Sequence, residues 1–250
     1  METKVRIETS KGDIVVKLYD QTPKHRDNFI KIAKDGSLNG TLFHRVINEF
    51  MIQGGDPDSK TAVKGQRLGS GNLGYKVPAE FNVPTYFHKK GALAAAREGD
   101  QVNPEKASSS CQFYIVTGKV YKDGELDTLE ISRNQQRMNE VFYQLANKKA
   151  AEIMAFRRSG NQEALLDLQD SLFTEAQKVV EKETPFAFTT QMRQAYTTIG
   201  GTPHLDGQYT VFGEVIEGLE VLDEIQKVAT DDYDRPLTDV VIKKVKVIED

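Results

Sequence analysis

The chain has 250 residues, 38% hydrophobic and 28% charged, which suits one large domain or two modest ones. Its 33 Lys and Arg against 37 Asp and Glu give a net charge of -4. Proteins that neutralise many phosphates are usually basic, so we expect no nucleic-acid partner. The single cysteine, Cys111, excludes an internal disulfide and a four-cysteine zinc site, and we expect it to be a small core residue.

The sequence contains no apolar run that approaches the roughly 18 residues of a membrane helix. Its first four residues, Met1-Glu2-Thr3-Lys4, show no apolar segment of the signal-peptide type. We therefore expect no membrane span and a cytoplasmic protein. If an N-terminal signal has been removed, the protein would instead be exported, either periplasmic or lipid-anchored.

The first 36 residues predict a β-hairpin followed by a helix. Apolar and polar residues alternate over 4–18, around turn-forming residues at 10–13. Thr22 can cap the helix, Pro23 suits its first turn and Gly36 ends it.

Short strands separated by loops follow this helix. A long loop-like stretch covers 56–91, and apolar residues over 219–228 are spaced like one side of a second helix. The remaining strands are expected at 43–47, 50–53, 91–96, 112–117, 209–215 and 244–247. Many short strands with two short helices predict a mainly-β fold, a closed β-barrel capped by the two helices.

Residues 119–190 break this pattern because they favour helices. Two apolar stripes, over 138–153 and 165–179, lie on either side of Gly160-Asn161, a helix stop followed by a cap. They predict an antiparallel helical hairpin. We therefore expect a discontinuous barrel of residues 1–118 and 191–250, interrupted by an inserted hairpin of residues 119–190.

Three motifs are better explained without chemistry. The segment 69–74 matches the G-x-G-x-x-G dinucleotide pattern, but Tyr75-Lys76-Val77-Pro78 cannot open the helix that the motif needs, so we expect a loop. The four histidines show no spacing typical of a metal site. Serines 108–110 with His204 and Asp206 lack the nucleophile-elbow sequence of a hydrolase.

Chemistry is denser over residues 43–56, where Arg45 and Gln53 sit among apolar residues of two short strands. An Arg in that position must face a cavity or find partners. An ion-paired Arg at the barrel rim is the plainer interpretation.

Five segments together resemble the cyclophilin family of peptidyl-prolyl cis-trans isomerases, over about residues 4–118 and 198–250. They are Phe43-His44-Arg45-Val46-Ile47-Asn48-Glu49-Phe50-Met51-Ile52-Gln53-Gly54-Gly55-Asp56, Gly91-Ala92-Leu93-Ala94-Ala95-Ala96-Arg97, Ser110-Cys111-Gln112-Phe113-Tyr114-Ile115, Leu205-Asp206-Gly207 and Val211-Phe212-Gly213-Glu214-Val215. The resemblance implies a closed eight-stranded barrel with a helical insertion. It also implies catalysis of rotation about X-Pro bonds in peptides and unfolded protein clients, without metal or cofactor.

The resemblance also implies roles for individual residues. Arg45 would donate to the prolyl nitrogen, and Gln53 would hold its guanidinium. The apolar proline pocket would comprise Phe50, Met51, Tyr114 and Leu205. Gln112 and the backbone of Ala96 and Arg97 would anchor the substrate chain. Alternation independently predicts that Gln112 and Tyr114 point to one side of their strand and Phe113 to the other, into the core.

Four further positions depart from well-known family members. His204 stands where many eukaryotic members carry Trp, so we expect weak binding of cyclosporin-type inhibitors. Tyr209 stands in place of a His, Arg97 of an Asn and Tyr114 of a Phe. The Tyr114 hydroxyl concerns substrate preference more than catalysis. A non-catalytic proline-binding or chaperone module is the alternative function.

The predicted hairpin leaves the barrel just after Tyr114 and returns just before His204, so we expect it beside the groove. Three roles are open to it: a structural lobe, an extended surface for protein clients, or a homodimer contact.

Overall fold

A computed structural model describes residues 3–248, and the chain divides into two units. The sheet unit comprises the residues up to Tyr121 and those from Thr190 onward. The hairpin unit comprises Lys122–Thr189. No helix in the described part of the chain is long and apolar enough to cross a membrane.

Among the described residues, the sheet unit contains ten strands, three α-helices and two 3-10 helices. In chain order they are β1 (Lys4–Thr9), β2 (Gly12–Leu18), α1 (Pro23–Lys34), β3 (Arg45–Ile47), β4 (Met51–Gly54), η1 (Pro57–Thr61), β5 (Lys76–Val77), β6 (Ala92–Ala95), β7 (Ser108–Ser109), β8 (Phe113–Val116), α5 (Thr190–Thr198), η2 (Pro203–Leu205), β9 (Val211–Glu217), α6 (Leu219–Ile225) and β10 (Ile242–Ile248). The hairpin unit contains α2 (Asp123–Lys148), α3 (Ala150–Ser159) and α4 (Gln162–Val180).

Eight strands form one antiparallel sheet in the order β10-β1-β2-β9-β6-β8-β4-β3, and β5 pairs with β7 in a small second sheet. The predicted hairpin is β1 and β2, paired from Lys4 opposite Lys17 to Thr9 opposite Gly12. The order places β3 and β4 beside β8 and β6, and β9 beside β6, so that the segments singled out in the sequence are neighbours in space.

The large sheet is strongly curled but open, and the prediction of a closed barrel is wrong. A single isolated bridge, Leu42 with Val241, lies just before the two edge strands β3 and β10. β3 is only three residues long, and its Val46 N–H donates to the backbone oxygen of Asp234 at 2.8 Å instead. A loop residue therefore occupies the edge that a closing ladder would need.

The two faces of the sheet carry two separate clusters of buried apolar side chains. Ile52, Leu93, Phe113 and Ile115 belong to the main core, together with residues of α1 and α6. Their strand neighbours Met51, Ala92, Ala94, Tyr114 and Val116 belong to a second, smaller cluster on the other face. Successive strand residues point to opposite faces, so this alternation separates the core from the face on which a site can form. Cys111 lies in the main core, as expected.

The predicted helices near both ends of the sheet unit form, but α1 is capped differently from our prediction. Thr22 makes no capping bond; its hydroxyl donates to the Tyr19 carbonyl at 3.3 Å. The Glu80 carboxylate instead accepts from the backbone N–H groups of Lys24 at 3.1 Å and His25 at 3.0 Å. A carboxylate suits the positive end of a helix, and this one comes from a distant loop.

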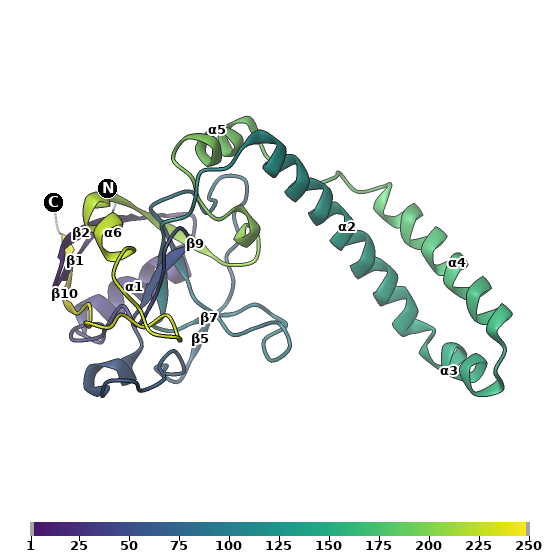
Figure 1. The fold of residues 1–250 in the computed structure, drawn as a ribbon, viewed down its shortest axis with the longest axis horizontal. Coiled ribbons are helices and arrows are strands. Elements are labelled where there is room, and N and C mark those ends of the chain that lie inside the picture. The colour runs from purple at the N-terminus through teal and green to yellow at the C-terminus, as the bar shows by residue number, and fades with distance from the viewer. Residues whose placement is uncertain (1–2, 249–250) are drawn as a thin grey trace. The chain divides into compact units, whose positions relative to one another are not determined.

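In the hairpin unit, α2 and α4 run antiparallel side by side, with α3 between them in the chain (Figure 1). Gly160 ends α3 at a φ of 68°, and the Asn161 side chain caps α4 by accepting from the Ala164 N–H at 3.1 Å. The Arg137 guanidinium binds both Glu183 oxygens, at 2.9 and 2.7 Å, which ties the end of the hairpin to α2. Three helices form where two were predicted, because the first stripe breaks at Lys149.

Candidate active site

A row of directly opposed residues crosses four strands of the large sheet. Arg45 on β3 pairs with Gln53 on β4, Gln53 pairs with Tyr114 on β8, and Tyr114 pairs with Ala94 on β6. Opposed residues of antiparallel strands place their side chains on the same face. Neighbouring strands are about 4.8 Å apart, so the backbones of Arg45 and Tyr114 are separated by about 10 Å. We call this surface the site face.

The apolar residues predicted to grip a proline ring gather at one end of this row. Met51 and Tyr114 are buried, and Phe50 and Leu205 pack against them half-buried. The exposed His204 stacks on Phe50 with ring centroids 5.6 Å apart. The structure therefore brings all five side chains to one apolar patch of the site face.

The Tyr114 hydroxyl is engaged inside the protein. It lies 2.8 Å from Nε2 of His88, a fully buried residue, and burial raises the pKa of Tyr114 well above its ordinary value. The side chain therefore offers its ring, like a Phe, to the site face. The effect of this hydroxyl on substrate preference stays a prediction.

Arg45 is the one cation of this row and is 43% exposed. Its Nε lies 3.6 Å from an Asp234 oxygen, a long contact with an equally exposed carboxylate. The Arg45 guanidinium makes no hydrogen bond to Gln53 in the described structure; the Gln53 amide N–H donates to the Gln112 side-chain oxygen at 3.0 Å. The predicted contact of Gln53 with Arg45 is thus replaced by one that continues along the sheet.

Gln112 links the site face to the glycine-rich segment 69–74. Its amide donates to the carbonyls of Gly69 at 2.9 Å and Gly71 at 2.7 Å. The buried Asp56 carboxylate accepts from the Gly69 N–H, and a Cβ at Gly71 would meet that carboxylate at 2.0 Å. The segment is therefore a loop, as predicted, and it is fastened tightly beside the row.

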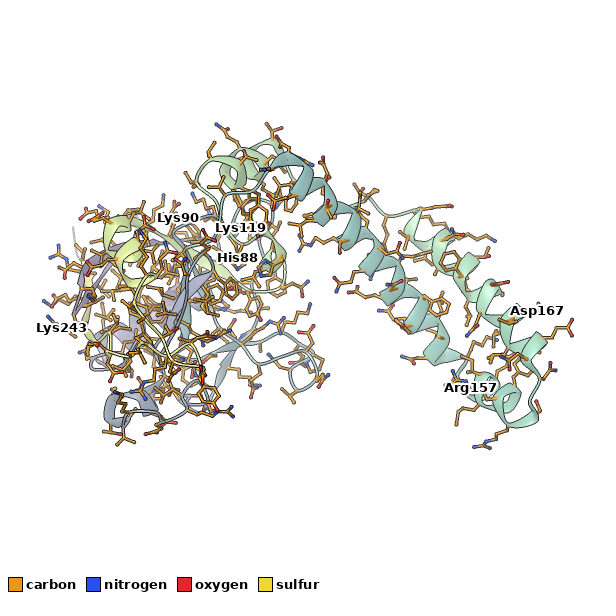
Figure 2. The ribbon with its side chains drawn as sticks, viewed as in Figure 1. His88, Lys90, Lys119, Arg157, Asp167 and Lys243 are labelled. Carbon is orange, nitrogen blue, oxygen red and sulfur yellow. The ribbon has the colours of Figure 1, made fainter. Side chains whose placement is uncertain are left out.

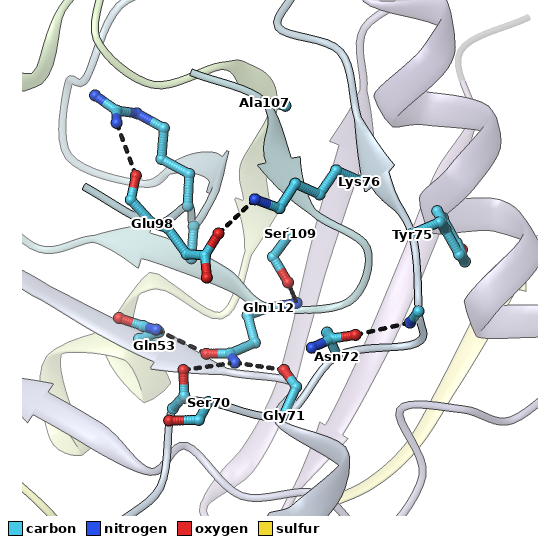
Figure 3. Close-up of a pocket in the computed structure, with 14 residues that line it drawn as sticks. Gln53, Ser70, Gly71, Asn72, Tyr75, Lys76, Glu98, Ala107, Ser109 and Gln112 are labelled. Atoms are coloured by element: carbon cyan, nitrogen blue, oxygen red, sulfur yellow. Dashed lines mark hydrogen bonds and ion pairs between the residues drawn. The ribbon is translucent and has the colours of Figure 1, made fainter. Parts of the chain in front are cut away.

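A cavity of about 460 Å³ lies between this loop and the strand ends (Figure 3). Lys76 and Glu98 form an ion pair in its lining and point toward each other (Figure 3). Gln53, Ala96, Arg97 and Gln112, all predicted site residues, also line it. The other lining residues are Gly69, Ser70, Gly71, Asn72, Gly74, Tyr75, Ala107 and Ser109.

Arg97 and Tyr209 support each other beside the cavity. The Arg97 guanidinium lies 4.5 Å from the centroid of the Tyr209 ring and donates to Asp100 at 2.6 Å and to the Gln208 carbonyl at 2.8 Å. Tyr209 in turn meets the Tyr114 ring edge-on at 5.8 Å. The Ala96 N–H is bonded to the Gln112 carbonyl at 3.0 Å, so Ala96 contributes packing and not a free backbone donor.

The residues that the structure describes assemble no metal centre. Those residues contain no group of three or more His, Cys, Asp and Glu side chains suited to a metal ion. Asp206 Oδ1 lies 2.9 Å from Nδ1 of His88. The Ser108 hydroxyl lies 2.9 Å from Nε2 of His25, whose Nδ1 lies 2.7 Å from Glu80, but Ser108 and His25 are both buried, so this serine is not open to a substrate.

The family model described as "Cyclophilin type peptidyl-prolyl cis-trans isomerase/CLD" matches residues 4–142 and 174–247. The chain belongs to this family.

Full-length relatives of this cyclophilin-type chain occur in staphylococci. A protein of Staphylococcus saprophyticus, whose name assigns it to the peptidyl-prolyl cis-trans isomerases, is 31% identical over 249 residues, 99% of this chain and 93% of that protein. A Streptococcus pyogenes protein named as a bifunctional phosphatase and peptidyl-prolyl cis-trans isomerase is 31% identical, covering 98% of this chain and 39% of that protein.

Solved cyclophilin structures share the fold. A Cryptosporidium parvum cyclophilin-type isomerase superposes with a TM-score of 0.57 and 21% identity, covering 100% of this chain and 99% of that one. The same cyclophilin in the presence of the dipeptide Ala-Pro gives a TM-score of 0.56 and 20% identity, covering 99% of each chain. The mainly-β fold of this chain is therefore the cyclophilin fold.

Several residues around this cyclophilin site were not identified from the sequence. Asp234, the ion-pair partner of Arg45, lies far along the chain in a turn. Lys76 and Glu98 are charged residues far apart in the sequence, and only the folded structure shows that they form an ion pair. His88 belongs to no sequence motif, and no local pattern predicts its hydrogen bond to Tyr114.

Proposed function

We propose that the chain catalyses cis-trans rotation of X-Pro bonds, with Arg45 as the donor to the prolyl nitrogen. The observation that carries this proposal is the row Arg45–Gln53–Tyr114 on one face of the sheet. It sets a permanent cation about 10 Å from an apolar patch, a spacing that the long Arg side chain can shorten. A bound proline ring would lie on Phe50, Met51, Tyr114 and Leu205.

The chemistry needs a donor and little else. Amide resonance imposes a barrier of about 18–20 kcal/mol, while cis and trans X-Pro forms differ by only about 0.5–1 kcal/mol. In the twisted transition state the prolyl nitrogen is pyramidal and regains a lone pair. A donor aimed at that nitrogen stabilises the twisted form and barely affects the planar one, so it lowers the barrier.

Arg45 is suited to this role by charge and by accessibility. A guanidinium stays protonated and carries five N–H donors. Within the described residues, Asp234 is the carboxylate paired with it, at 3.6 Å and with both groups 43% exposed, which leaves donors for a guest. An exposed pair of this kind contributes only about 0–1 kcal/mol, so a substrate can displace it at small cost.

We further propose that proline-containing peptides are the substrates and that the cavity beside the row receives a side chain near the proline. The cavity shares Gln53, Ala96, Arg97 and Gln112 with the predicted substrate-binding set. The related Cryptosporidium structure with Ala-Pro supports a proline-containing ligand for this fold.

A protease-coupled assay with a proline peptide tests the proposal, using wild type, Arg45→Ala and Arg45→Lys. We expect Arg45→Ala to lower kcat/KM by roughly 10²–10³, the scale for one transition-state donor. Arg45→Lys, which keeps the charge but loses the fork of donors, should fall between the two. Unchanged activity in Arg45→Ala would refute the role of Arg45. A wild type that binds the peptide without turning it over would favour a non-catalytic proline-binding module.

A further inference from the structure

A buried chain of hydrogen bonds runs from the site face to helix α5. The Tyr114 hydroxyl lies 2.8 Å from His88 Nε2, His88 Nδ1 lies 2.9 Å from Asp206 Oδ1, and the Tyr196 hydroxyl lies 2.5 Å from Asp206 Oδ2. Exposure is 4% for Tyr114 and 0% for the other three. Figure 2 shows His88 in the sheet unit, on the opposite side of that unit from Lys243 in this view.

The direction of each bond follows from the chemistry of Asp206. A carboxylate only accepts, and Asp206 receives the Tyr196 hydroxyl and the backbone N–H of His88 at 2.8 Å. Nδ1 of His88 therefore carries the ring proton that Asp206 also accepts, which leaves Nε2 as an acceptor. Tyr114 then donates to Nε2. Every donor in the chain thus has one acceptor, and the side-chain orientations are interdependent.

The same bonds hold two parts of the proline pocket in place. One end of the chain fixes the Tyr114 ring. At the other end, Tyr196 fixes Asp206, the residue that directly follows Leu205 in the sequence. The Leu205 N–H also donates to the Thr202 carbonyl at 3.0 Å. The backbone of His88 joins the two ends, because its carbonyl accepts from the Thr202 N–H at 2.8 Å.

Tyr196 reaches this network from α5, a helix that contributes none of the five motif segments quoted from the sequence. It lies on α5 and packs against Gly201, where an added Cβ would approach its ring to within 2.6 Å. Its ring also meets Phe87 edge-on at 5.5 Å. A glycine at 201 therefore lets the Tyr196 hydroxyl reach Asp206.

We propose that Tyr196 is a positioning residue of the proline pocket, acting through Asp206 and His88 on Leu205 and Tyr114. This inference rests on the proposed isomerase function. It assigns to α5 a role in substrate binding, because the residues that the network holds are the apolar surface of the pocket and not the Arg45 donor. Loss of the network should therefore weaken peptide binding and leave the rate of the bound peptide nearly unchanged.

Two conservative variants and their combination test the proposal. Tyr196→Phe and Tyr114→Phe each remove one oxygen and keep the ring. We expect each to raise KM for a proline peptide about three- to tenfold, with kcat within about twofold of wild type. The double variant should be no worse than the poorer single one, because both break the same chain. Tyr143→Phe, at a 65% exposed tyrosine of the hairpin unit, is the matched control.

Peptide affinity by NMR titration and thermal melting accompany the kinetics. Tyr196→Phe with a lowered melting temperature but wild-type KM and affinity would overturn the inference, since a purely structural bond gives that result. Effects of the two variants that multiply in the double would also overturn it. An inactive wild type would instead defeat the proposed isomerase function, and the affinities would still decide whether Tyr196 shapes the pocket. A wild type with no measurable affinity would defeat both.

Discussion

The ion pair of Lys76 with Glu98 in the cavity lining should keep the site neutral toward charged peptides. The two side chains are 48% and 60% exposed and neutralise each other. Removing one leaves the other unopposed beside any peptide side chain that enters the cavity. Glu98→Gln should therefore favour acidic peptides, and Lys76→Met should favour basic ones.

The size of this preference follows from Coulomb's law. Two unit charges 4 Å apart interact by about 1 kcal/mol in water and about 4 kcal/mol at an effective dielectric constant of 20. Because both side chains are solvated, the lower figure applies, and kcat/KM should differ about fivefold between a charged peptide and its neutral counterpart and about 30-fold between oppositely charged peptides. Salt at 1 M shortens the screening length to about 3 Å and should remove most of the difference.

The assay is a panel of peptides with Glu, Ala or Lys at either of the two positions before proline, measured on wild type and both variants at low and high salt. We expect the two variants to prefer peptides of opposite charge, as measured by kcat/KM, and wild type to show little preference between them. If both variants keep the wild-type order, or if the preference survives high salt, the cavity does not receive that side chain.

Three further predictions concern the ion pair of Arg45 with Asp234, the stability of the fold as a function of pH, and the hairpin unit. Asp234→Asn, which tolerates the φ of 63° at that position, should change kcat/KM less than about fivefold, and a loss as large as that of Arg45→Ala would contradict the weak pairing. Burial lowers the folded-state pKa of His25 and His44 below the ordinary 6.5, so the unfolded chain binds more protons as the pH falls. The free energy of unfolding, measured with urea, should therefore be at its full value above about pH 6.5 and fall below that pH by up to about 1.4 kcal/mol per histidine per pH unit. The fall with pH should be less steep in His25→Gln. A free energy of unfolding that stays constant from pH 7.5 to 5.5 would contradict this. Replacing residues 122–189 by a short Gly-Ser linker should leave peptide kcat/KM within about threefold of wild type, because every proposed site residue lies in the sheet unit, and a larger loss in a folded variant would contradict that independence.

Local patterns predicted those features whose causes are local. Alternation along β8 placed Tyr114 on one face and Phe113 in the core, and the structure confirms both. Gly160-Asn161 ends one helix and caps the next because left-handed backbone and an Asn cap are properties of the residues themselves.

Features that depend on distant residues were missed. The carboxylate that caps α1 is Glu80, more than 50 residues after the helix start, so Thr22 was the wrong choice. Helix α5 buries only two side chains, Met192 and Tyr196, in a nine-residue polar segment, which gives too weak a periodic signal. Closure of the sheet depended on what covers its edges, and the backbone of Asp234 is not recognisable as an edge partner in the sequence.

The role of Arg45 is tested most directly by the rate of cis-trans exchange of a proline peptide at equilibrium. This rate is measured by NMR exchange spectroscopy on wild type and Arg45→Ala, and peptide binding is measured in the same samples. We expect the variant to bind the peptide with near wild-type affinity while exchange slows by roughly 10²–10³. Wild-type exchange in the bound peptide, or a loss of exchange explained entirely by lost binding, would contradict it.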